Sequence, residues 1–123
     1  MYTGNNLQLF RFKKYNEALA SYDKALEIKP DFYAAWYNRG LTLFRSGKYS
    51  EALASLNKAV EIKTDFYEAW NSRGWTLEKL ERFDEALKSY EKALEIEPDF
   101  ELAINNRRKL LAKLARDSSK NGL

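Results

Sequence analysis

The sequence predicts an all-α fold: a right-handed α-solenoid of antiparallel helix pairs with about seven helices, including a C-terminal capping helix. Residues 33–66 and 67–100 align without a gap and are identical at 17 of 34 positions, so the chain repeats every 34 residues. A period of this length is typical of repeats that bury their apolar faces against their neighbours. Each repeat contains two amphipathic helical patterns joined by short links, which makes consecutive helices antiparallel neighbours.

The apolar positions of each pattern form one stripe of a helix. In residues 50–62 this stripe is Ala52, Leu53, Leu56, Ala59 and Val60. Pro30 and Pro98 end the helices before them, and Gly47 is a natural helix stop, whereas Glu81 at the equivalent position is not. The predicted helices cover residues 5–13 (partial), 16–28, 33–46, 50–62, 67–80, 84–96 and 100–116.

Good capping side chains precede these helices at equivalent positions. The expected N-caps are Asn16, Ser50 and Asp84 for one helix of each pair, and Asp31, Asp65 and Asp99 for the other. In the last helix we expect Ile104, Leu111 and Leu114 to face the preceding pair, while Arg107, Arg108 and Lys109 face outward.

The period also defines the expected domain organisation. Residues 1–116 form a single domain, and residues 117–123 are a flexible tail. Within the domain we expect an incomplete first repeat in 1–32, complete repeats in 33–66 and 67–100, and a capping helix in 101–116. The first repeat departs from the others because Asn6 stands where the later copies have Gly40 and Gly74.

Composition excludes most chemical functions. The chain has no Cys and no His, which removes thiolate chemistry and the commonest general base and metal ligand. It also lacks a glycine-rich phosphate loop and a nucleophile motif. We therefore expect no enzyme activity, no catalytic residues, no cofactor and no metal. No apolar run approaches the roughly 20 residues of a membrane span, so a cytoplasmic protein without membrane association is expected.

The net charge of +3 comes largely from basic residues near the two ends. A terminal helix needs a solvated outer face, and acidic residues are interspersed through the middle of the chain. A nucleic-acid partner is therefore not expected.

The repeated positions resemble the tetratricopeptide repeat, whose pattern places Trp, Gly, Ala, an aromatic residue and Pro at fixed offsets. Gly and Ala stand where two helices cross closely, since a larger side chain there would push the helix axes apart. The matching residues are Trp36, Trp70, Gly40, Gly74, Ala18, Ala52, Ala86, Tyr22, Tyr90, Ala25, Ala59, Ala93, Pro30 and Pro98.

The resemblance implies a protein–protein interaction scaffold. In this family the first helix of each pair lines a concave groove that binds extended peptides or a partner helix. The implied partner-binding residues are Tyr37, Asn38, Leu41, Phe44, Arg45, Asn71, Ser72, Trp75, Glu78, Lys79, Asn105, Asn106 and Lys109, with Leu7, Phe10 and Arg11 before them. The partner itself is an unidentified protein or peptide. In the alternative interpretation, Leu41 and Trp75 pack between adjacent first helices.

One version of this groove in the family holds the C-terminal carboxylate of chaperone tails with Lys, Asn, Asn, Lys and Arg. The matching slots are Thr3, Leu7, Asn38, Glu68 and Ser72. Only Asn38 fits, and Glu68 would repel a carboxylate. The chain is therefore not expected to be a clamp of this type, and its ligand should be more apolar.

Arginine replaces the family's Leu at positions one period apart, Arg39, Arg73 and Arg107. A guanidinium on a packing helix must stay wet or paired. We expect it to join successive repeats, Arg39 with Asp23, Arg107 with Glu91 and Arg73 with Asn57. The alternative role is a ligand-binding ladder of arginines.

A second function class is self-association. The incomplete first helix and the open ends of a short array expose apolar surface. A second copy, or exchange of a terminal helix, would cover this surface and make the chain a homo-oligomeric structural module.

Overall fold

The computed structural model describes residues 4–120, with side chains from Asn6 onward. This part of the chain forms six helices and no strand. The helices group into two compact units, residues 1–64 and 65–123. The predicted all-α class and the antiparallel helix pairs are confirmed, but the described residues form six helices instead of about seven.

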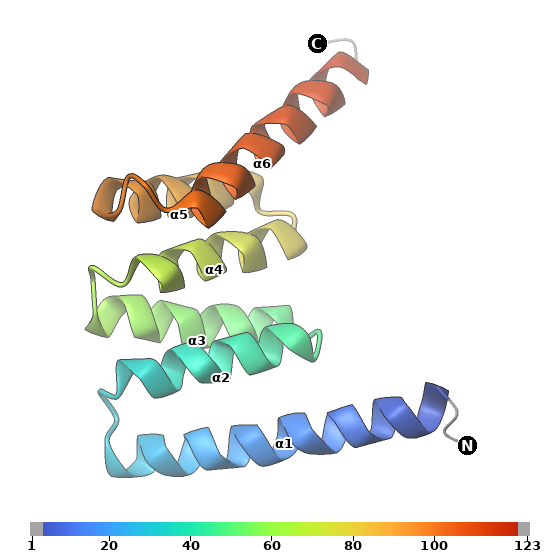
Figure 1. The fold of residues 1–123 in the computed structure, drawn as a ribbon, viewed down its shortest axis with the longest axis vertical. Coiled ribbons are helices and arrows are strands. Elements are labelled where there is room, and N and C mark those ends of the chain that lie inside the picture. The colour runs from blue at the N-terminus through green and yellow to red at the C-terminus, as the bar shows by residue number, and fades with distance from the viewer. Residues whose placement is uncertain (1–3, 121–123) are drawn as a thin grey trace. The chain divides into compact units, whose positions relative to one another are not determined.

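The first unit contains α1 (Gly4–Ile28), α2 (Tyr33–Arg45) and α3 (Tyr49–Ile62). Consecutive helices run antiparallel, and α2 packs against both α1 and α3 (Figure 1). The predicted stripe on α3 forms the core, because Ala52, Leu56 and Ala59 are fully buried and Leu43 of α2 packs among them at 2% exposure. Burial of this apolar stripe stabilises the helices more than their own propensity does.

α1 joins two segments that the sequence predicts as separate helices, 5–13 and 16–28. The corresponding turn in the second repeat is built on Gly47, whose φ is 82°. Its equivalent in the first repeat is Lys13, and α1 continues through it, whereas Glu81 at the same position of the third repeat adopts the left-handed conformation and forms the turn. Asn16 consequently lies inside α1 and is not an N-cap. The exposed fractions of Leu9 and Phe10 are 68% and 56%.

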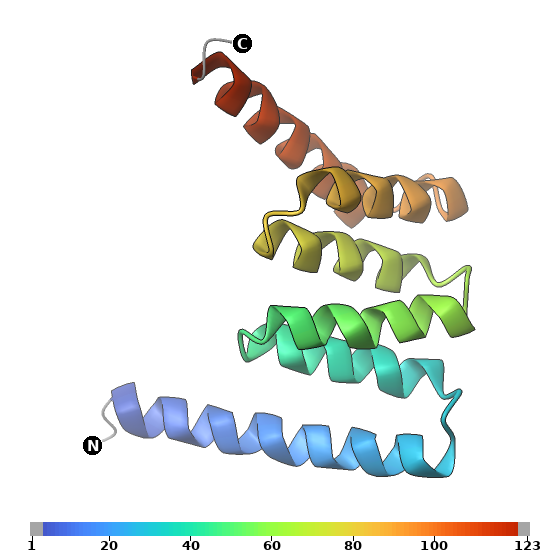
Figure 2. The same cartoon turned by 180° about the vertical axis from the view of Figure 1, so that it is seen from behind.

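The second unit contains α4 (Tyr67–Lys79), α5 (Phe83–Ile96) and α6 (Glu101–Lys120). α5 packs against α4 and α6, and α6 also contacts α4. α4 and α5 form an antiparallel hairpin that is clear from both sides of the molecule (Figure 2). Tyr90, Leu77, Ala86 and Ala103 are fully buried and form the core.

α6 differs from its prediction in length and in the face that it buries. The helix continues to Lys120, so residues 117–120 of the expected tail are helical. Ala103 and Leu110 are buried, whereas Ile104 and Leu111 are 39% and 40% exposed. Leu111 is equivalent to Leu77, which packs in the core of its helix pair, but no helix follows α6 within the described residues. The prediction that Ile104 and Leu111 face the preceding helix pair is therefore wrong.

The helix starts also differ from the predicted caps. The N-cap residues are Phe32, Lys48, Phe66 and Arg82, and none of these side chains makes a capping hydrogen bond. Ser50 and Asp84 thus lie in the first helical turn, Asp31 and Asp65 precede the cap, and α6 begins two residues after Asp99. Tertiary packing decides where these helices begin, and local capping preferences do not. Asp84 still favours the start of α5 through the helix dipole.

The turn between α4 and α5 contains a strained residue. Glu81 has a φ of 59° at the position where Gly47 has 82°. The left-handed conformation costs a non-glycine residue about 1–2 kcal/mol, and glycine adopts it freely at some cost in unfolded-state entropy. We expect Glu81→Gly to raise the free energy of unfolding by about 1 kcal/mol, measured by urea denaturation. Gly47→Glu is the reciprocal control and should destabilise; unchanged midpoints in both variants would contradict the prediction.

Candidate protein-binding site

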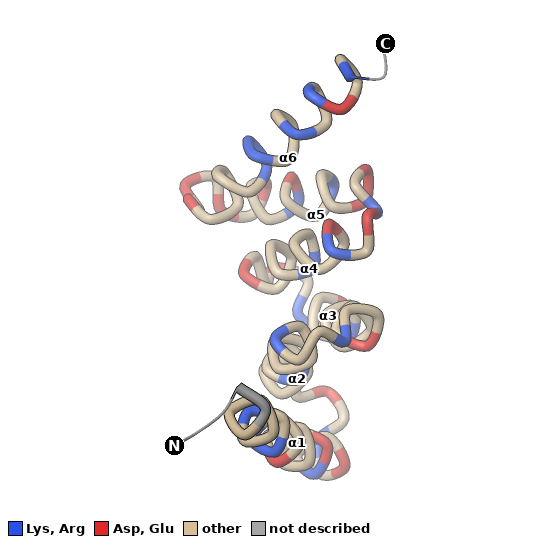
Figure 3. The backbone as a smooth tube through the Cα atoms, turned by 90° about the vertical axis from the view of Figure 1, so that its right-hand side faces the viewer, with Lys and Arg blue, Asp and Glu red and all other residues tan. Residues whose placement is uncertain are grey.

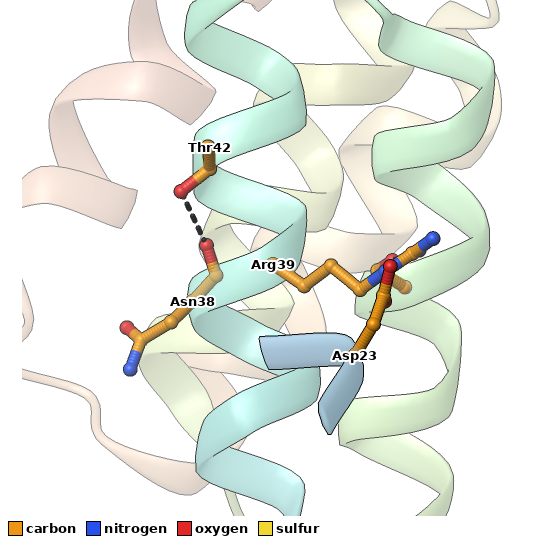
Figure 4. A network of polar contacts seen from close by, with 5 residues as sticks. Asp23, Asn38, Arg39 and Thr42 are labelled. Atoms are coloured by element: carbon orange, nitrogen blue, oxygen red, sulfur yellow. Dashed lines mark hydrogen bonds and ion pairs between the residues drawn. The ribbon is translucent and has the colours of Figure 1, made fainter. Parts of the chain in front are cut away.

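A repeated arginine joins neighbouring helices in both units. Arg39 donates from Nε to the Asp23 carboxylate at 2.8 Å, and its side chain extends from α2 toward Asp23 (Figure 4). Arg107 lies 3.4 Å from the carboxylate of Glu91. Both predicted ion pairs are confirmed. The expected contact of Arg73 with Asn57 stays a prediction, because these residues belong to different units.

Two buried serines complete the arginine contacts, although no sequence-based prediction named them. The hydroxyls of Ser55 and Ser89 accept hydrogen bonds from Arg39 and Arg73, each at 2.6 Å. The signal was present in the sequence, since Ser21, Ser55 and Ser89 also lie one period apart. Burial lowers the pKa of the Arg73 guanidinium. Because these guanidinium groups bind neighbouring helices, the structure favours a structural role over a ligand-binding ladder.

The predicted partner-binding residues of the first unit lie on α2. Asn38 and Arg45 are exposed, whereas Tyr37, Leu41 and Phe44 are half-buried. The Phe44 ring packs edge-on against Tyr49, with 5.2 Å between the ring centroids. The Asn38 side chain leaves α2 on the side opposite Arg39 (Figure 4). Asn38 is therefore presented to solvent, while Phe44 serves partly as a packing residue.

The second unit presents a tryptophan beside an open pocket. Trp75 is 49% exposed. It borders a pocket of about 270 Å³ near the ends of α4 and α5, lined also by Glu78, Lys79, Glu81, Phe83 and Lys113. Trp75 is more exposed than its equivalent Leu41, which is only partly accessible to solvent. This favours a partner surface over core packing for Trp75.

Glu78 departs from the repeat and is bound from within the protein. Phe44 is its equivalent in the second repeat, and the Glu78 carboxylate accepts a hydrogen bond from the phenol of Tyr90. Tyr90 is fully buried. Burial, followed by the hydrogen bond and the charge of Glu78, raises the pKa of Tyr90 well above its ordinary value. The predicted partner-binding role of Glu78 thus competes with a structural one.

The expected asparagines of the second unit mostly bind one another or their neighbours. Asn71 is only 7% exposed, and its side-chain oxygen accepts from Asn106 of α6 at 3.1 Å. Asn105 accepts from Arg108 at 2.9 Å. Ser72 is half-buried and Lys109 is exposed. The structure therefore places Asn71 inside the unit and not on its surface, because α6 packs over α4 there.

Two of the six basic residues of α6 (blue in Figure 3) form ion pairs with carboxylates, and a third binds a neutral amide. Arg107 lies beside Glu91, Lys113 lies 3.0 Å from Asp117, and Arg108 binds Asn105. The two ion pairs lower the positive potential that a nucleic-acid backbone needs. Among residues 4–120, no helix is long and apolar enough to cross a membrane, and no cluster of three potential metal ligands occurs.

The fold and the repeated glycines, alanines and tryptophans define a class of proteins built from stacked helix pairs. Models of the tetratricopeptide repeat match residues 33–66 and 67–100, and a further model of this repeat matches residues 8–47. The chain belongs to the tetratricopeptide repeat (TPR) family, whose members bind proteins.

Two similar solved structures come from RPAP3 proteins. The first TPR of Spaghetti (RPAP3), bound to the HSP90 peptide SRMEEVD, is 34% identical with a TM-score of 0.80, covering 86% of this chain and 84% of that chain. The first TPR domain of human RPAP3 is 33% identical with a TM-score of 0.81, covering 89% and 87%.

YrrB, a TPR protein with an unusual peptide-binding site, is 25% identical with a TM-score of 0.73. The similarity covers 88% of this chain and 58% of that chain. Comparison with curated protein sequences gave no match.

Proposed function

We propose that the chain is a non-catalytic interaction scaffold that binds a peptide or a partner helix, with Trp75 of α4 in the second unit as the main contact. The observation that carries this proposal is Trp75, a large aromatic side chain that is half exposed beside an open pocket with a polar rim. Exposed aromatic groups rimmed by polar residues are typical of binding hot spots, and tryptophan is enriched among them.

The expected ligand is more apolar than a chaperone tail. Of the five carboxylate-clamp slots, Thr3 lies outside the described residues and Leu7 is an exposed apolar residue. Asn38 is exposed, but Glu68 and Ser72 are half-buried and bring no positive charge. A carboxylate-terminated peptide would therefore lose the cationic contacts that give such clamps their strength.

A chaperone tail is nevertheless a second candidate ligand. The observation that favours it is the 34% identity to the first TPR of Spaghetti, which was solved with the HSP90 peptide SRMEEVD. Titration with this peptide distinguishes the two candidates. Our proposal expects SRMEEVD to bind at least about tenfold more weakly than an apolar peptide selected on the chain; equal or tighter binding of SRMEEVD would favour the second candidate.

The role of Trp75 is tested with peptides selected from a random library on the wild-type chain. We expect Trp75→Ala to weaken binding of the selected peptides by about 2 kcal/mol, or roughly 30-fold, as hot-spot truncation does. Leu102→Ala is the matched control, since Leu102 is 60% exposed in the same unit but does not line the pocket. Circular dichroism verifies that both variants remain folded. Unchanged calorimetric affinity in Trp75→Ala would refute the site.

Self-association remains an alternative for the first unit. Leu7, Leu9, Phe10 and Phe12 at the start of α1 are all at least 45% exposed. A second copy of the chain that covers them would remove a large apolar area from water. Sedimentation velocity across a range of concentrations separates a dimer of this kind from a monomeric peptide-binding scaffold.

A further inference from the structure

A basic side chain recurs at the same place in every repeat. Arg11, Arg45, Lys79 and Lys113 are spaced by 34 residues. Each unit contains one open pocket lined by two of them and by an aromatic ring at an equivalent position: Arg11, Arg45 and Tyr15 in the first unit, Lys79, Lys113 and Phe83 in the second. The repeat thus builds the same kind of pocket twice, and the remaining lining residues decide what each one binds.

The pocket of the first unit contains no acidic residue. It has a volume of about 320 Å³ and is lined by Gln8, Arg11, Phe12, Tyr15, Arg45 and Ser46. Arg11 and Arg45 are exposed, and neither forms an ion pair with a carboxylate of the described chain. A third cation is close by, because Lys48 Nζ lies 5.9 Å from the centre of the Phe12 ring. The positive charge here has no internal counter-charge.

The pocket of the second unit is neutralised from within. Glu78 and Glu81 line it together with Lys79 and Lys113. Lys113 is also paired with Asp117 at 3.0 Å and lies 4.6 Å from the centre of the Phe83 ring. The equivalents of Glu78 and Glu81 in the first repeat, which forms most of the other pocket, are Phe10 and Lys13, and neither carries a negative charge. The pocket of the first unit therefore keeps its positive charge because it lacks these two glutamates, whereas the glutamates neutralise the pocket of the second unit.

The net charge of the first unit as a whole is also positive. Residues 1–64 contain ten Lys and Arg against six Asp and Glu, whereas residues 65–123 contain eleven against twelve. Like charges around a shallow cavity raise the local positive potential and attract anions. Guanidinium groups bind carboxylates with paired, charge-assisted hydrogen bonds, which makes two arginines a stronger carboxylate site than two lysines.

We propose that the pocket formed by Arg11, Tyr15 and Arg45 binds an acidic side chain, Asp or Glu, of the partner peptide. This rests on the proposed function, that the chain binds a peptide, and it concerns the first unit alone. The Arg11 and Arg45 guanidinium groups bind the carboxylate. The rings of Phe12 and Tyr15 pack against its methylene groups. The partner therefore combines apolar residues with at least one acidic residue.

The test uses hexaglutamate with acetylated and amidated ends, so that only side-chain carboxylates are present, and hexaglutamine as the neutral control. In NMR titrations of the full chain, we expect hexaglutamate to shift the amide signals around Arg11 and Arg45, and hexaglutamine to shift none. Arg11→Gln with Arg45→Gln should weaken binding of hexaglutamate by about tenfold or more. Lys79→Gln with Lys113→Gln removes the same net charge and should weaken it by less than about threefold.

Equal losses in the two double variants would overturn the proposal, because general charge attraction would then explain the binding. Retention of wild-type affinity in the arginine variant would also overturn it. All four residues lie at the surface or at the rim of a pocket, so circular dichroism should show unchanged helix content. The two proposals fail separately: loss of the hexaglutamate effect with retained Trp75-dependent peptide binding refutes only the acidic subsite.

Discussion

Replacing Gly74 with valine is expected to lower the free energy of unfolding by about 3 kcal/mol. A Cβ atom at position 74 would lie 2.6 Å from Cε1 and 2.7 Å from Cδ1 of Tyr90. Tyr90 is fully buried, so its ring has no free space to move into. Overpacking of this kind forces backbone shifts or strained rotamers, and it outweighs the better helix propensity of valine. Urea unfolding measures the change.

Gly40 provides a matched comparison for this substitution. A Cβ atom there would lie 2.8 Å from Cγ and 2.9 Å from Cδ2 of Leu56. The leucine side chain rotates more easily than a buried ring, so Gly40→Val should cost less, about 2 kcal/mol. In the double variant Gly74→Val with Tyr90→Ala, the loss of unfolding free energy should be smaller than the sum of the two single losses. A double-mutant cycle measures this difference. An unfolding midpoint of Gly74→Val at or above that of the wild type would contradict the close-packing argument.

The repeat pattern predicted the frame of this protein because each repeated position has a local packing reason. Gly40 and Gly74 meet the large side chains of the next helix, and Ala52 and Ala86 are fully buried at the equivalent position. Arg39 likewise reaches Asp23, sixteen residues before it. These contacts depend only on residues inside a helix pair or its neighbour, so a period of 34 residues is sufficient to infer them.

The errors occurred where one residue or a missing neighbour decides the structure. α1 continues through Lys13, the equivalent of Gly47, although the segment before it has the sequence of a first helix. Leu111 is exposed because, within the described residues, no further helix covers the face that Leu77 buries. Comparison of equivalent residues predicts neither effect, because Glu81 forms the turn without glycine and the exposure of Leu111 depends on a neighbouring helix.

The candidate site was less predictable than the fold. The family's groove positions included Asn71 and Glu78, but Asn106 and Tyr90 bind these side chains inside the second unit. Both partners come from other helices, and neither contact repeats: Tyr37 is the equivalent of Asn71, and Leu56 the equivalent of Tyr90. Trp75 is the aromatic residue among the predicted groove positions of α2 and α4 that combines a departure from the repeat with exposure of about half its surface, 49%. The sequence therefore predicted which positions could contact a partner. The structure shows which of these side chains are bound inside the unit and which are exposed enough to do so.

Tyr90 is expected to give the chain a stability that falls steeply above pH 10. Its phenol is buried and donates to the Glu78 carboxylate, and burial is the main cause that raises its pKa. In the unfolded chain the phenol titrates near its ordinary pKa of about 10. Above that pH the unfolded state has lost a proton that the folded state still holds. The contribution is therefore complete below pH 10 and declines by about 1.4 kcal/mol per pH unit above it.

Comparison with Tyr90→Phe isolates this contribution from other groups that titrate in the same range. Below pH 9 the variant should be less stable by about 1 kcal/mol, because the half-buried Glu78 carboxylate loses its donor. Above pH 10 the wild type should lose stability faster, so that the two free energies of unfolding converge near pH 11. Tyr15→Phe removes a phenol from the surface of the first unit and controls for the mere loss of a tyrosine. If wild type and Tyr90→Phe lose stability in parallel between pH 9 and pH 11, the buried phenol is not retained in its protonated form.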